Sequence, residues 1–187
     1  MPPLLKPAQS ILLFLDPRPE HLERLDPASR APTTHKLATA HRAAQLASVP
    51  IHLASNGTFG PAKTWIVLAA PFVAANTHDL PPTSVQWRES PLGMALATSD
   101  RNSLVLCGFW LECTATFTAL AANAEGIDVA VLMDATPHWH AETKQPAIDR
   151  LMQAGVVPMT TAQMIMEWAE DGAVTTKRQL MSLLSEF

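Results

Sequence analysis

Short apolar runs that stop abruptly are the feature that most limits what this chain can fold into. The first run, Ser10 to Leu15, is unbroken and stops at Asp16-Pro17. An unbroken run of this length is typical of a strand that is buried on both faces, as in a parallel sheet. Four further runs repeat the pattern, at 49–54, 103–107, 128–133 and 155–160. The sequence therefore predicts a set of parallel strands.

Segments with helical periodicity lie between these runs. They cover 35–46, 112–125 and 141–154, and the tail from 162 to 187 has the same pattern. The stretch from 65 to 87 is less regular, and we expect a helix there followed by a third strand near Ser84 to Arg88. The alternation predicts an α/β fold with three αβα layers, Rossmann-like, around a mostly parallel sheet of about six strands.

Composition narrows the class of protein. With 187 residues, 48% of them hydrophobic and 16% charged, we expect one domain over 1–187. The net charge of −4 gives no basic excess for nucleic acid or a membrane surface, so a small-molecule substrate is expected. The chain shows no secretory signal and no run of the ~20 apolar residues that span a membrane, which favours a cytoplasmic protein.

Cofactor and metal signals are missing from the pattern. The two cysteines, Cys107 and Cys113, form no disulfide framework or zinc knuckle, and no glycine-rich phosphate or dinucleotide loop occurs. His138 and His140 flank Trp139, but no carboxylate pattern completes a ligand set around them. We therefore expect neither a cofactor nor a metal.

Ligands of open parallel sheets bind where the strands end, because the loops diverge there and helix N-termini point inward. This rule selects Asp16, the loop 55–59, Arg88, the turn 108–114 and Asp134. Asp16 can be a general base, an orienting group or a turn residue. Arg88 can supply a fixed positive charge or lie in solvent as a strand-end residue.

Cys113 lies at the predicted start of a helix, where the peptide dipoles lower the pKa of a thiol. This position suits a nucleophile. Free cysteine also packs as a small apolar side chain, and Cys107, inside an apolar run, is expected to do so.

The segment 104–135 resembles the signature of the isochorismatase-like superfamily, and weaker similarity extends over nearly the whole chain. The resemblance implies an aspartate after the first strand, a cysteine nucleophile at a helix start and usually a lysine after the third strand. Asp16 occupies the first position, and Arg88 stands at the third as an arginine, as in one orphan branch of the family.

The position of the nucleophile differs from the family pattern. The family cysteine follows the strand-closing glycine by six residues, and counting from Gly108 reaches Thr114, one residue beyond Cys113. Cys113 could serve only if the preceding turn were one residue shorter, since one helical position is a rotation of about 100°. A threonine hydroxyl needs a base, and isochorismatases use water without this cysteine. Asp16, Arg88, Cys113 and Thr114 are the expected catalytic set.

For the same turn, the resemblance also implies which groups bind the substrate. The family has a non-proline cis peptide here, which by position would join Trp110 and Leu111, whose amides are the expected oxyanion donors. Phe59, Phe109 and Trp87 are the expected substrate contacts.

Two functions remain open. The first is a hydrolase acting on a small amide, imide or vinyl ether. The second is a degenerate member kept as a binding or assembly module, in which Phe109, Trp110 and Trp87 fill the former pocket. In both cases we expect a homo-oligomer, with the apolar tail after Val174 as a contact surface.

Overall fold

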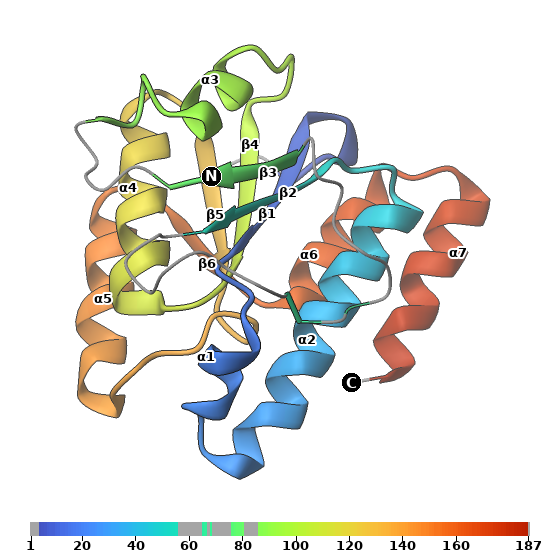
Figure 1. Ribbon diagram of the computed structural model, residues 1–187. Helices are drawn as coiled ribbons and strands as arrows, with labels where there is room; N and C mark the ends of the chain where they lie inside the picture. Colours follow the sequence, from blue (N-terminus) through green and yellow to red (C-terminus); the bar gives the residue numbers. More distant parts are fainter. Residues whose placement is uncertain (1–3, 56–64, 67, 69–75, 81–85, 187) are drawn as a thin grey trace.

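The computed structural model describes residues 4–55, 65–66, 68, 76–80 and 86–186, and its strands form one parallel sheet (Figure 1). The strand order is β3-β2-β1-β4-β5-β6, and every neighbouring pair runs parallel. The predicted α/β fold with a six-stranded parallel sheet is therefore confirmed. The strands are β1 (Ser10–Leu15), β2 (Ile51–Ser55), β3 (Thr77–Asp79), β4 (Ser103–Gly108), β5 (Asp128–Leu132) and β6 (Val157–Met159).

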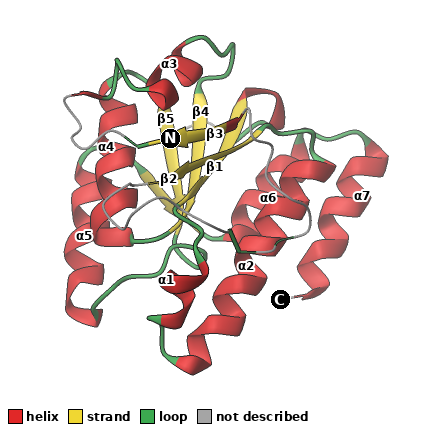
Figure 2. Ribbon diagram, viewed as in Figure 1, coloured by secondary structure: helices red, strands yellow, loops and turns green. Residues whose placement is uncertain are grey.

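Helices cover both faces of the sheet, as Figure 2 shows. Successive side chains of a strand point to opposite faces, so Phe14 packs into one core and Leu13 into the other. On the Phe14 side the covering helices are α2 (Pro27–Leu46), α6 (Thr161–Glu170) and α7 (Val174–Leu183). On the Leu13 side they are α3 (Pro91–Ala97), α4 (Thr116–Ala124) and α5 (Ala141–Gln153). Burial on both faces explains why β1 is apolar throughout.

Three boundaries differ from the prediction. Helix α2 begins at Pro27 rather than at residue 35, because a proline is tolerated in the first helical turn, where its missing N–H needs no partner. The third strand is Thr77–Asp79, whereas residues 86–89 form turns; residues 84–85 and most of the helix expected within 65–87 lie outside the described residues. The tail forms two helices, because α6 ends before Gly172.

The chain order reverses between β1 and β4, and this reversal places the candidate site. From β1 the chain continues outward to β2 and β3 on one side, and from β4 to β5 and β6 on the other. Leu15 and Gly108, the last residues of β1 and β4, are register partners. Gly108 has φ 110°, and a Cβ there would collide with the backbone oxygen of Leu15. Ligands of open α/β sheets bind at such a reversal, at the carboxyl ends of the strands.

None of the helices in the described part of the chain is long and apolar enough to cross a membrane.

Candidate functional site

Asp16 directly follows β1 at the chain-order reversal and is 1% exposed. Its φ is 47°, in the left-handed region that aspartate adopts more readily than most side chains. The residue lies between its own strand and α1 (Pro19–Glu23), which carries the chain away from the carboxyl edge (Figure 1).

Three polar side chains surround the Asp16 carboxylate. Arg18 Nε donates to Oδ1 at 2.7 Å, and Ser55 Oγ donates to the same oxygen at 2.8 Å. Arg18 Nη2 also donates to Ser55 Oγ at 2.6 Å, which closes a triangle. His21 Nε2 lies 3.5 Å from Oδ2. We call Asp16, Arg18, His21 and Ser55 the Asp16 network; all four are buried.

The network keeps Asp16 ionised. Burial by itself raises the pKa of a carboxyl group, but hydrogen bonds from His21 and Ser55 and the positive charge of Arg18 outweigh it. The pKa of Asp16 is therefore lowered from its ordinary value of 3.8. At neutral pH the side chain is a carboxylate with a fixed counter-charge.

Trp110 determines which ring nitrogen of His21 carries the proton. The indole Nε1–H of Trp110 can only donate, and it lies 3.2 Å from His21 Nδ1, which must therefore be the acceptor. A neutral imidazole with an accepting Nδ1 has its proton on Nε2, the nitrogen that faces Asp16. The Trp110 contact thus orients a donor toward the carboxylate.

Aromatic rings continue the network toward the surface. Phe109 stacks on His21 with ring centroids 5.4 Å apart, and Trp110 meets His21 edge-on at 5.5 Å. Trp139 stacks on Trp110 at 5.5 Å and is 41% exposed, with the Arg24 guanidinium 5.7 Å from its ring centroid. Phe109 and Trp110 are almost fully buried, so their rings occupy the space beside the network.

The turn after β4 holds both candidate nucleophiles. Residues Leu111–Ala115 form one π-helical turn before α4, in which Thr114 is half-buried and Cys113 is exposed. Burial of the sulfur and the negative charge of Glu112 raise the pKa of Cys113 above its ordinary value of 9.0. The thiol is therefore not acidified by its position. Cys107 is fully buried in β4, and burial raises the pKa of that thiol well above 9.0.

The oxyanion prediction requires two corrections. The cis peptide joins Phe109 and Trp110, one residue earlier than expected. The Leu111 N–H donates to the Pro137 carbonyl at 2.9 Å, so it is already used in the fold and is not directed to a ligand.

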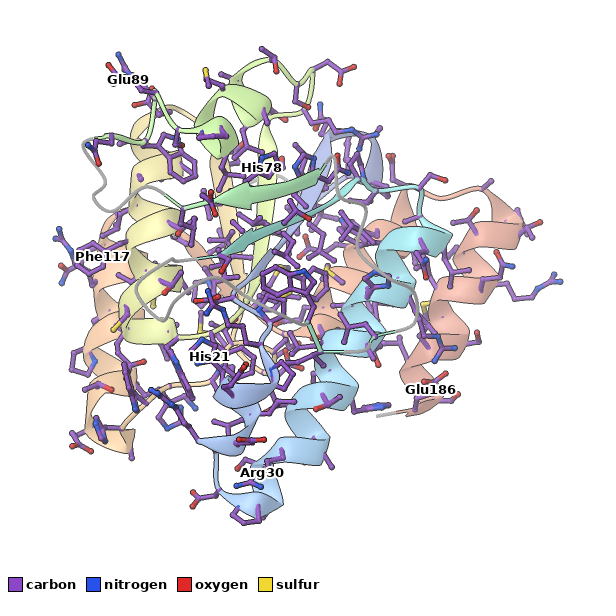
Figure 3. The ribbon with its side chains drawn as sticks, in the orientation of Figure 1. His21, Arg30, His78, Glu89, Phe117 and Glu186 are labelled. Carbon is purple, nitrogen blue, oxygen red and sulfur yellow. The ribbon has the colours of Figure 1, made fainter. Side chains whose placement is uncertain are left out.

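Arg88 lies at the other edge of the sheet. Its Nε donates to both carboxylate oxygens of Glu125 at 2.7 Å, and Glu125 shortly precedes the first residue of β5. Figure 3 shows the neighbouring Glu89 at the top of the molecule and His21 in its lower half. Of the two interpretations of Arg88, the structure favours a residue in solvent, and it lies in turns before α3 rather than at a strand end.

Of the expected substrate contacts, Trp87 does not join the Asp16 network. Trp87 is buried, but it packs with Leu92 and Leu96 of α3 in the core on the Leu13 side. Phe59 lies outside the described residues. Of the two predicted substrate contacts that the structure describes, Phe109 reaches the Asp16 network, through His21.

Sequence reasoning missed Arg18 and His21. The signal was the segment Asp16-Pro17-Arg18, since a cation two residues from a strand-end aspartate can turn back onto it. Ser55 was within the predicted ligand loop 55–59, but without an assigned role. His21 carries no comparable signal, because its position depends on Trp110, far away in the sequence.

Glu112 has a structural role. It accepts hydrogen bonds from the Trp139 N–H at 2.7 Å and from the Thr143 hydroxyl at 2.7 Å. Burial raises the pKa of Glu112, but these hydrogen bonds and those from backbone N–H groups lower it overall. The side chain fixes the loop that carries Trp139.

Within the described ranges, no group of three or more His, Cys, Asp or Glu side chains could hold a metal ion.

Known proteins share this fold and part of this sequence. The Isochorismatase domain model matches residues 86–163. The chain is 32% identical to the probable hydrolase YcaC of Escherichia coli (strain K12) over 89 residues, which is 46% of this chain. The match spans only 43% of the length of that curated relative.

Solved structures match over a longer stretch. The Escherichia coli YcaC gene product, named an octameric hydrolase of unknown specificity, has a TM-score of 0.79 at 24% identity, covering 98% of this chain and 92% of that one. YcaC from Pseudomonas aeruginosa, solved with hexane-2,5-diol and covalent acrylamide, has a TM-score of 0.78 at 18% identity, with the same coverage. At these identities the likeness shows the fold alone.

Proposed function

We propose, from the premise that this chain belongs to the isochorismatase-like family, that it is a hydrolase which works without a cysteine thiolate. The substrate class is a small amide, imide or vinyl ether. The observation that carries the proposal is the Asp16 network at the chain-order reversal, where an ionised carboxylate, an arginine and an oriented imidazole converge.

The properties of the thiol support a reaction without cysteine. A nucleophilic cysteine needs a lowered pKa, whereas the pKa of Cys113 is raised. Thr114 stands at the family position of the nucleophile, but a hydroxyl attacks only when a base removes its proton. Among the described residues, no hydrogen bond joins the Thr114 hydroxyl to Asp16, so this carboxylate is not placed to activate it. Thr114 is therefore proposed to position water rather than to attack.

The proposed step is attack by water. For an amide or imide, the water oxygen forms a bond to the carbonyl carbon while one of its protons passes to Asp16. The carbon–nitrogen bond then breaks as Asp16 delivers that proton to the leaving nitrogen. Arg18 balances the carboxylate charge at rest, and His21 Nε2 faces Oδ2 at 3.5 Å. General-base assistance of this kind contributes about 10²- to 10⁴-fold in rate.

Turnover of a panel of small amides, imides and vinyl ethers tests the proposal. We expect Asp16→Asn to lower kcat/KM by about 10²- to 10⁴-fold and Cys113→Ala to leave it unchanged. Arg88→Ala is the matched control, because it removes an arginine at the opposite edge of the sheet from Asp16. Loss of turnover in Cys113→Ala would overturn the thiolate-free mechanism.

A binding module is the second candidate, and the burial of Phe109 and Trp110 beside His21 favours it. If the rings fill the space that a substrate needs, the wild-type chain turns over no member of the panel. Trp110→Ala would then open the site, and calorimetric binding of a panel compound to that variant alone would support this function. Turnover by the wild-type chain would exclude it.

We also propose that the chain forms a homo-oligomer, since the Escherichia coli relative is an octamer. Val174 of α7 is 76% exposed and Met181 of the same helix 42%, which suits a contact between copies. The molar mass from light scattering, compared between the wild type and Val174→Asp, tests this proposal. A wild-type chain of monomer mass would contradict it.

A further inference from the structure

Thr136 has a buried hydroxyl with no hydrogen-bond partner. The residue is 2% exposed, and its Oγ1 contacts no donor or acceptor among the described residues. A hydroxyl can donate one hydrogen bond and accept two, and leaving it buried and unpaired costs stability. Such groups are rare in folded proteins, and each calls for a physical explanation.

Other buried threonines at this edge are paired. Thr116 Oγ1 donates to the Leu111 carbonyl at 2.6 Å, and Thr161 Oγ1 donates to Asp134 at 2.9 Å. The local fold thus provides partners for hydroxyls that serve structure. Thr136 differs from them, although it lies in the same region of the molecule.

The loop of Thr136 is tied to the candidate site on both sides. Gly108 N–H donates to the carbonyl of the preceding Ala135 at 2.9 Å, and Leu111 N–H donates to the carbonyl of the following Pro137 at 2.9 Å. Thr136 is therefore held against the turn that carries Phe109 and Trp110. The same turn bonds to β1, because Phe109 N–H donates to the Leu15 carbonyl at 2.8 Å. The backbone on both sides of Thr136 and the backbone of Leu15, which precedes Asp16, thus bond to the same turn.

We propose that the Thr136 hydroxyl is a ligand-binding group of this site, which hydrogen-bonds an oxygen of the reacting molecules. That oxygen belongs either to the attacking water or to the carbonyl or ether group of the substrate. The proposal rests on the proposed function for the identity of the ligand, but the unpaired hydroxyl is observed independently of it.

Thr136→Val removes the hydroxyl and keeps the shape of the side chain, and Thr136→Ser keeps the hydroxyl. We expect Thr136→Val to lower kcat/KM about tenfold, the value of one hydrogen bond, and Thr136→Ser to restore it. A lower kcat at constant KM identifies water as the partner, whereas a higher KM identifies the substrate. The melting temperature of Thr136→Val should stay the same or rise, since an unpaired buried group is removed.

Two results overturn the proposal. If Thr136→Val melts higher and keeps its kcat/KM, the hydroxyl is merely unpaired. If the variant melts lower, the hydroxyl serves the fold.

A crystal structure separates this proposal from the proposed function. When the wild-type chain turns over no compound of the panel, the hydrolase assignment fails, and the electron density at Thr136 Oγ1 decides the present inference. Density for a water or soaked panel compound within hydrogen-bond distance in the wild type, lost in Thr136→Val, supports it. Empty density in the wild type overturns it.

Discussion

Two arginine–carboxylate pairs of the same length lie at opposite edges of the sheet. Arg18 and Asp16 are 2.7 Å apart at the carboxyl edge, with side chains only 5% and 1% exposed. Arg88 and Glu125 are also 2.7 Å apart at the amino edge, with side chains 77% and 29% exposed. Water screens the exposed pair, whereas the buried pair has lost its hydration and depends on its partners. The contribution of each pair to stability therefore depends on its burial and not on its distance alone.

The largest effect is expected from breaking the buried pair. Arg18→Met leaves the Asp16 carboxylate in the interior without its counter-charge, and we expect a loss of about 3–5 kcal/mol in the free energy of unfolding, measured with urea. The double variant Asp16→Asn/Arg18→Met should recover part of this loss, because no charge is then left unpaired. A loss below about 1 kcal/mol in Arg18→Met would mean that the pair behaves like the exposed one.

The second-largest effect is expected from acid, which should weaken the buried pair. Because the folded pKa of Asp16 is below its ordinary 3.8, its contribution to stability is complete above pH 3.8 and disappears as the pH falls through the lower folded value. The wild type should therefore lose stability relative to Asp16→Asn on going from pH 5 to pH 2, by at most about 1.4 kcal/mol per pH unit. Parallel pH curves for the two proteins would contradict a lowered pKa.

A smaller effect is expected from the aromatic partner of the network. Trp110→Phe removes the donor to His21 Nδ1 and should cost about 1–3 kcal/mol, because a buried acceptor is left unpaired. Nitrogen-15 NMR should show the His21 ring with its proton on Nε2 in the wild type and a changed spectrum in the variant. Trp168→Phe is the matched control, since it removes an indole donor to Ser10 and should leave His21 as it is.

The smallest effect is expected at the amino edge. Arg88→Ala should leave the urea midpoint unchanged, because both partners exchange the ion pair for water. A change comparable to that of Arg18→Met would refute the contrast between the edges.

The candidate site could be predicted only where the local sequence decides it. Asp16 was found because an apolar run ending in Asp-Pro marks the end of a buried strand. Arg88 was misplaced because the stretch from 65 to 87 has no clear period, and a third strand was expected near residues 84–88 instead of Thr77–Asp79. The cation beside Asp16 is Arg18, and selecting it required knowing how the chain turns after β1.

The turn after β4 shows a similar limit. Counting from Gly108 separates Cys113 from Thr114 by position, but the exposure of the thiol depends on the π-helical turn at Leu111–Ala115. A π-helical turn adds a residue to a helical turn, and local propensity does not signal it. The effect of burial and Glu112 on the thiol therefore became visible only in the structure.

The sequence by itself determined the α/β architecture and the parallel direction of its strands, and it selected Asp16 at their carboxyl edge. Those features follow from apolar periodicity, which can be read within each segment without knowing how the strands pair. Only the tertiary structure decided which charges meet, that Trp110 orients His21, and that Thr136 is buried without a partner. Such contacts join residues that are distant in sequence, and they depend on side-chain positions that are fixed only when the core packs.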